Sequence, residues 1–146
     1  MRRLIVAAAL IALHAAPDAQ SVQNRASQAD GVVRLLSDLE TALTAGKLAD
    51  FQAMSSARMP PTAADIFRHS LGETRVTTAV IRERQRKPLE GGFEVFAEVL
   101  VSHGRDARVS TWVITVQPRN AGNERYEIAD LIELVCLVSV GSGRVR

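Results

Sequence analysis

Three residues in the C-terminal half of the chain have the types and spacing of a small-ligand site. In the segment 124–134, "ERYEIADLIEL", Asp130 falls on the same face of an extended strand as Tyr126 and Ile132, because alternate side chains of a strand point the same way. If that face lines a cavity, a carboxylate beside an aromatic ring is typical of a ligand site, and Trp112 on a neighbouring strand could complete it. The alternative is that Asp130 faces solvent near a sheet edge, since sequence alone does not determine the register of a strand.

Other residues of catalytic type have ordinary surroundings in the sequence. His103 and Asp106 lie in one turn, which favours a solvated turn pair over a catalytic dyad. Asp65 and His69 are four residues apart and therefore share a helical face, which predicts a pair on a helix surface.

Metal and cofactor chemistry have little support in the sequence. The histidines and the single cysteine, Cys136, show no paired spacing of a zinc site. The C-terminal "GSGRVR" lacks both the helix and the lysine spacing of a phosphate-binding loop. No serine nucleophile elbow and no Cys–His pair stands out. We therefore expect no metal, no cofactor and no catalytic residue that a motif identifies.

A helix that breaks once and resumes is predicted ahead of the strands. The first helix is expected to begin at 27–30, where Ser27 or Asp30 could cap it. Its apolar positions follow the spacing of one helical face: Val32, Leu35, Leu36, Leu39 and Leu43. Gly46 stands where a helix commonly closes with a left-handed residue, and the apolar spacing restarts directly after it.

A third helix and a set of strands follow. Pro60 and Pro61 end the second helix, because consecutive prolines cannot continue a helical ladder. Thr62 could cap a short helix that Gly72 stops. After Gly72 the apolar period changes from helix to strand. Four strands are expected, over residues 76–86, 93–101, 109–117 and 125–134, joined by polar turns. Short turns predict an antiparallel meander, so the fold class is α+β, with helices packed on a curved antiparallel sheet.

Three arginines in the first strand do not indicate a nucleic-acid partner. Arg82, Arg84 and Arg86 alternate along one predicted face, and Glu94 and Glu98 share a face of the neighbouring strand. Opposite charges on adjacent strands pair across a solvated sheet face, which explains both sets. Aromatic residues make up only 4% of the chain, so few rings are present for base stacking.

The N-terminus has the pattern of a secretory signal peptide over residues 1–19. Two arginines precede an apolar run, and small residues follow where a signal peptidase could cut, for example after Ala19. The alternative is an uncleaved N-terminal anchor. We expect a periplasmic or secreted protein with no stable membrane span after cleavage. Residues 20–29 are polar and without strong periodicity, which predicts a flexible lead.

We expect residues 30–138 to form one domain and residues 139–146 to form a tail. A length of 146 residues with 47% hydrophobic and 23% charged residues is ordinary for a single globular domain. Residues 134–140 are apolar without a polar face, as in a final strand buried on both sides. The alternative is that the chain is truncated and belongs to a larger protein.

Two segments resemble the nuclear transport factor 2-like superfold, which includes ketosteroid isomerase and the SnoaL-like proteins. "LETALTAGKLADFQAMSS" is similar to its opening helices, and "ERYEIADLIEL" to its closing strand. The resemblance spans about residues 30–134 and implies a cone-shaped, cystatin-like arrangement in which dimers through the sheet are common. "VIRERQRKPLEGGFEV" also resembles the leading domain of large exported bacterial proteins that carry zinc aminopeptidase-like regions. The HExxH motif of those regions is absent, so peptidase activity does not carry over.

Two functions are compatible with these observations. The first is an exported accessory or small-ligand-binding domain without catalytic machinery, whose partner is a small apolar ligand or the remainder of a larger polypeptide. The second is an isomerase or dehydratase of the cone cavity that uses Asp130 as its general base. A homodimer is expected as a further partner, and a nucleic acid is not.

Overall fold

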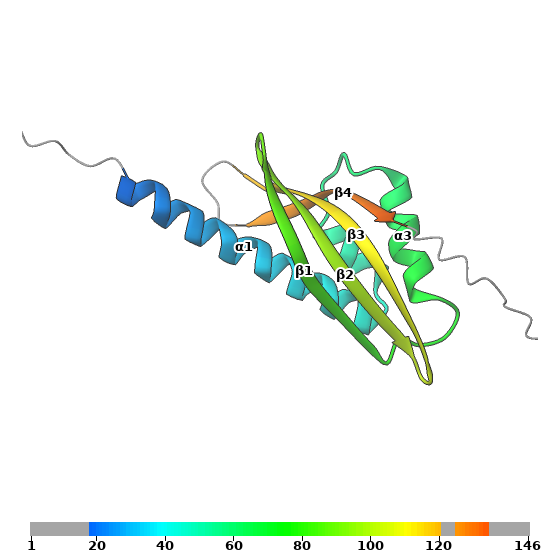
Figure 1. Cartoon of the computed structure of the whole chain (residues 1–146). Coiled ribbons are helices and arrows are strands. Elements are labelled where there is room, and N and C mark those ends of the chain that lie inside the picture. Colours follow the sequence, from blue (N-terminus) through cyan, green and yellow to red (C-terminus); the bar gives the residue numbers. More distant parts are fainter. Residues whose placement is uncertain (1–17, 121–124, 135–146) are drawn as a thin grey trace, which may run out of the picture.

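The computed structural model of the chain describes residues 18–120 and 125–134 (Figure 1). For residues 18–30 it describes the backbone but not the side chains. Within the described ranges, helices and strands follow one another as α1 (Asp18–Ala45), α2 (Leu48–Ala53), α3 (Pro61–Leu71), β1 (Thr78–Leu89), β2 (Gly92–His103), β3 (Asp106–Pro118) and β4 (Tyr126–Leu134). The expected α+β class is confirmed. Cys136 lies outside the described residues. So do most of the predicted signal peptide and the predicted tail at 139–146, and both therefore stay predictions.

The four strands form one antiparallel sheet in the order β1-β2-β3-β4, as the short polar turns predicted. The helices lie together on one face of this curved sheet, with α1 crossing behind β1 and β2 (Figure 1). Strand β1 runs further than expected and includes Pro88, which the sequence placed in a turn. Proline is tolerated there because β1 is an edge strand and its free side needs no N–H donor.

The predicted break at Gly46 is confirmed. Gly46 has a φ of +66°, and its amide donates to the Leu43 carbonyl over 3.1 Å while the Lys47 amide donates to Ala42 over 3.1 Å. These bonds satisfy the last carbonyls of α1 and turn the chain into α2. Helix α3 begins one residue before the expected cap, with Pro61 in its first turn, where a missing N–H is harmless.

The start of α1 differs from the prediction. Its backbone is helical from Asp18, so the segment 20–29, expected to be a flexible lead, is helical, and neither Ser27 nor Asp30 begins a helix. The physical reason is that no proline or glycine stands between Asp18 and Asp30, and residues with fair helix propensity fill the gap. Among the described helices, none is long and apolar enough to span a membrane.

The hydrophobic core fills the space between the helices and the inner face of the sheet. The largest fully buried side chains come from all layers: Trp112, Phe51, Phe67, Leu39, Leu43, Ile114, Ile128 and Leu131. The rings of Phe51 and Phe67 stack with centroids 4.4 Å apart and join α2 to α3. Each such side chain contributes about 1.5–3 kcal/mol to the free energy of unfolding.

Each edge strand contains a β-bulge that changes which face its later residues occupy. In β1 the register shifts between Glu83 and Gln85, and in the β3–β4 ladder Val116 pairs with Ile128 while Thr115 pairs with Asp130. An extra residue reverses the alternation of every side chain after it. The bulges therefore decide which polar side chains reach the inner face.

Candidate functional site

A cleft of about 870 Å³ lies between α1, α2 and the adjoining ends of β3 and β4. We call it the arginine cleft, and its lining residues are Gly31, Arg34, Leu35, Asp38, Asp50, Ala53, Met54, Arg119, Arg125 and Tyr126. Its volume falls within the range of small-molecule sites. Leu35 and Met54 supply the apolar part of the lining, which we call the floor, and the exposed charged side chains form the rim.

Helix α1 supplies one wall of the arginine cleft because four of its residues share a face. Gly31, Arg34, Leu35 and Asp38 are spaced by three, one and three residues, which is the repeat of a single helical stripe. Leu35 is buried, while Arg34 and Asp38 are exposed along the rim. The stripe presents an apolar centre between two opposite charges.

Tyr126 forms part of the opposite wall. The residue is 7% exposed, and its ring lies 6.0 Å from the ring of Phe93, centroid to centroid. Its hydroxyl forms no hydrogen bond with any residue that the structure describes, so the donor is available to a ligand. Burial raises the pKa of Tyr126 above its ordinary value of 10.0, and the positive charge of Arg86 opposes that rise. At neutral pH the hydroxyl is therefore a neutral donor.

Three guanidinium groups line the arginine cleft. That of Arg119 is fixed, because its Nη2 donates to the carbonyl of Ala53 and its Nε lies 3.5 Å from Oε2 of Glu127. Arg34 and Arg125 form no side-chain ion pair or hydrogen bond within the described ranges, although the carboxylates of Asp38 and Asp50 line the same cleft. The free donors of two arginines are thus directed to solvent or to a ligand.

The predicted trio of Trp112, Tyr126 and Asp130 is not brought together. Tyr126 lines the arginine cleft, whereas Trp112 is fully buried in the core opposite Ala97 and Glu133. The indole Nε1 of Trp112 has no hydrogen-bond partner among the described residues. Trp112 is therefore a core residue beneath the sheet and does not line the arginine cleft.

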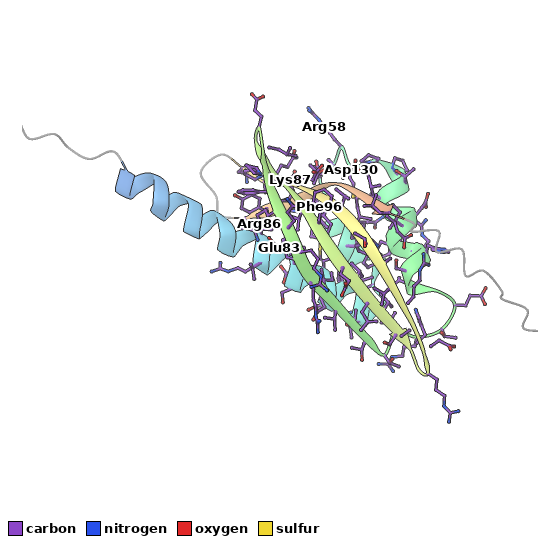
Figure 2. The ribbon with its side chains drawn as sticks, in the orientation of Figure 1. Arg58, Glu83, Arg86, Lys87, Phe96 and Asp130 are labelled. Atoms are coloured by element: carbon purple, nitrogen blue, oxygen red, sulfur yellow. The ribbon has the colours of Figure 1, made fainter. Side chains whose placement is uncertain are left out.

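Asp130 lies on the outer face of the sheet, so its predicted placement beside Tyr126 is wrong. The bulge in β4 pairs Asp130 with Thr115, one residue out of phase with the inward-facing Ile114. Oδ1 of Asp130 accepts a hydrogen bond from the Leu131 amide over 2.8 Å (Figure 2). Ile132 follows Asp130 on the outer face, while Tyr126 and Ile128 face inward.

The other candidate pairs have structural partners. Nδ1 of His103 lies 2.9 Å from the carbonyl oxygen of Thr74 and links the α3–β1 connection to the end of β2. Asp65 pairs with Arg68 on the exposed side of α3 and has no hydrogen bond to His69. Across residues 18–120 and 125–134, no group of three or more His, Cys, Asp or Glu side chains could hold a metal ion.

Sequence reasoning missed the arginine cleft. Its charged residues come from three separate segments, and each segment alone has the composition of an ordinary polar surface. The one local signal is the stripe on α1, in which charges interrupt the apolar repeat at Arg34 and Asp38. Nothing in the sequence indicates that this stripe meets the β3–β4 end.

Comparison with known proteins places the fold. No family model matches the sequence, and no curated protein matches it. The structure is similar to that of a designed protein of the nuclear transport factor 2 fold, with a TM-score of 0.56, over 73% of this chain and 99% of the designed one. The chain has the nuclear transport factor 2-like fold. At 12% sequence identity this likeness concerns the nuclear transport factor 2-like fold alone, which hosts several unrelated functions.

Proposed function

We propose that this chain is a small-ligand-binding domain whose ligand occupies the arginine cleft. The observation that carries the proposal is the combination of a cleft of about 870 Å³ with the buried Tyr126, whose hydroxyl has no partner among the described residues. A few convergent polar groups around an apolar floor are typical of a ligand site. The nuclear transport factor 2-like fold is compatible with this role.

The proposal extends to a non-catalytic role in an exported protein. Its support is that Asp130, the general base predicted from the sequence, lies on the outer face of the sheet. An isomerase or dehydratase acting through Asp130 would need that carboxylate beside the ligand. Export rests on the pattern of residues 1–19, and the accessory role in a larger polypeptide rests on the apolar segment 134–140.

Filling the arginine cleft tests the proposal directly. Ala53 is exposed at the end of α2 and lines the cleft, so Ala53→Trp adds a ring to the cleft and leaves the core intact. Gln52→Trp is the matched control, because Gln52 is its exposed neighbour on α2 and does not line the cleft. A library of small acids, amines and neutral compounds is screened by the rise in melting temperature. We expect compounds that stabilise the wild type and Gln52→Trp but not Ala53→Trp; an equal response of all three proteins contradicts the proposal.

A second copy of the chain is also a proposed partner. Phe96, Val113 and Ile132 lie opposite one another on β2, β3 and β4 and form an apolar row across the outer face. Ile132 is 49% exposed, and the ammonium of Lys87 lies 4.5 Å from the ring centroid of Phe96 (Figure 2). Val113 at the centre of the row is 9% exposed, so the exposed end at Ile132 is what supports association through the sheet. Sedimentation of the wild type against Ile132→Lys tests it, with a wild-type monomer as the contrary result.

A further inference from the structure

The charges around the arginine cleft determine which ligands it can accept. Arg34, Arg119 and Arg125 line the cleft together with Asp38 and Asp50, and Glu127 beside the cleft pairs with Arg119. A single anionic group can pair with Arg34 and Arg125, whereas a multiply charged anion would also meet the two carboxylates. A cationic ligand would meet three guanidinium groups.

The donors in the cleft also match one chemical group. Guanidinium groups bind carboxylates through pairs of parallel hydrogen bonds, and the donors of Arg34 and Arg125 are not used by any described side chain. The Tyr126 hydroxyl adds a neutral donor from the wall. Arg119 is already held by Ala53 and Glu127, so it forms a fixed part of the wall and leaves the ligand's carboxylate to Arg34 and Arg125.

The floor of the cleft suits an apolar chain or ring. Leu35 is buried at the centre of the α1 stripe, and Met54 is half-buried at the end of α2. The unbranched thioether of Met54 can adapt to ligands of different shape. The rim is therefore charged and the floor apolar, so the cleft fits a ligand that has a polar head and an apolar body.

We propose that the arginine cleft binds a small monocarboxylate with an apolar body, held at its carboxylate by Arg34 and Arg125. This inference rests on the proposed ligand-binding function and names the class of ligand. The apolar ligand expected from the sequence is thereby narrowed to an amphiphilic acid. Recognition combines charge-assisted hydrogen bonds at the rim with burial of the apolar body on Leu35 and Met54.

Three probes of equal chain length test the class of ligand: sodium octanoate, octylamine and 1-octanol, titrated by calorimetry into the full chain. Octanoate should bind more tightly than either of the others. Arg34→Gln and Arg125→Gln should each weaken octanoate binding about tenfold, the loss expected for one charge-assisted hydrogen bond. Arg58→Gln is the matched control, since Arg58 is exposed in the α2–α3 connection and does not line the cleft (Figure 2); its octanoate affinity should equal that of the wild type.

The possible results separate the ligand class from the ligand-binding function. Octylamine or 1-octanol binding as tightly as octanoate, in a way that Ala53→Trp abolishes, overturns the monocarboxylate and leaves the ligand site standing. No octanoate binding, or octanoate binding that Arg34→Gln and Arg125→Gln leave unchanged, also overturns the monocarboxylate. Failure of Ala53→Trp to affect any ligand of the wider library overturns the site itself. Both arginines are exposed, so the unliganded variants should melt at the wild-type temperature.

Discussion

Arg86 holds the carboxylate of Glu83 at two points on the inner face of the sheet. Its Nε donates to Oε1 over 2.8 Å and its Nη2 donates to Oε2 over 2.6 Å (Figure 2). The side chain of Arg86 is only 16% exposed and that of Glu83 27%. Glu83 lies beside α1, where it shares a cleft of about 260 Å³ with Leu36 and Glu40. The β1 bulge creates this pair, because it turns Arg86 to the inner face that Glu83 already occupies.

The Glu83–Arg86 pair should contribute measurably to stability. Glu83→Gln removes the negative charge and leaves the positive charge of Arg86 partly desolvated. We expect a loss of about 1–2 kcal/mol in the free energy of unfolding, measured by urea denaturation. Asp65→Asn is the control, because its partner Arg68 is more than half exposed and such pairs contribute less than about 0.5 kcal/mol. Equal losses in the two variants would show that partial burial of Glu83 and Arg86 adds nothing.

Gly91 in the β1–β2 turn and Gly92 at the start of β2 should respond very differently to the same substitution. A Cβ at Gly92 would lie 2.0 Å from the carbonyl oxygen of Val116, so the backbone must move. A Cβ at Gly91 would meet no atom within 4 Å, and only its φ of +82° opposes a side chain. We expect Gly92→Ala to cost more than about 3 kcal/mol in the free energy of unfolding and Gly91→Ala about 1 kcal/mol. Guanidinium denaturation measures both, and similar losses would contradict the role of Val116.

Local patterns predicted the helical break and the meander because both depend on neighbours in the sequence. At Gly46 the helix ends through two bonds, one from Gly46 to Leu43, three positions before it, and one from Lys47 to Ala42, five positions before Lys47. The turns between strands are short and polar, so the order of the strands along the chain is also their order in the sheet. The likeness to the nuclear transport factor 2-like fold therefore follows from local signals that agree with one another.

The errors in side-chain placement have one cause. Strict alternation placed Arg86 with Arg82 and Arg84 on one face, and Asp130 with Tyr126 on another. A bulge precedes Arg86 in β1 and Asp130 in β4, and each reverses the face of the residues that follow. Of the predicted cross-strand pairs, that of Arg84 with Glu98 is confirmed at 2.8 Å, whereas Arg86 pairs with Glu83 of its own strand. No residue type in either strand predicts a bulge.

The arginine cleft could not be predicted because it is a product of tertiary packing. Its walls come from α1, α2 and the β3–β4 end, and the residues Arg34 and Arg125 are about ninety positions apart in the sequence. Tyr126 was found from the sequence because an aromatic residue in an alternating strand is a local signal. Its partners in the cleft have no such signal.

Titration of Tyr126 should lower stability at high pH. Burial raises the pKa of Tyr126 in the folded protein above its unfolded value of 10.0, so the folded state holds the proton more tightly. This contribution to stability is fully present below pH 10 and is lost as pH rises through the folded pKa. The free energy of unfolding, measured from neutral pH to above pH 10, should fall less steeply in Tyr126→Phe than in the wild type. Because Tyr126 is the single tyrosine, tyrosinate absorbance reports its pKa without ambiguity; parallel stability curves for the two proteins would contradict the shift.

Glu40 should protect the free edge of β1. Its Oε2 accepts a hydrogen bond from the Ile81 amide over 2.8 Å, so a donor on the edge strand is satisfied by α1. The opposite edge is covered by the chain itself, since the Ile128 amide donates to the Met54 carbonyl over 2.9 Å and the Ser56 amide donates to the Ile128 carbonyl over 2.8 Å. Unpaired strand edges are templates for aggregation, and Glu40 covers the edge of β1 at Ile81.

Removing the acceptor at position 40 therefore has two expected effects. Glu40→Ala leaves the partly buried Ile81 amide without its partner and should cost about 1–2 kcal/mol in the free energy of unfolding. It should also increase the fraction of protein that aggregates on heating, measured by light scattering, because another chain can pair with the exposed amide. Glu40→Gln retains an acceptor oxygen at the same reach and should lose less than about 0.5 kcal/mol without added aggregation. If Glu40→Gln behaves like Glu40→Ala, the charge of Glu40 matters and the hydrogen bond to the strand edge does not.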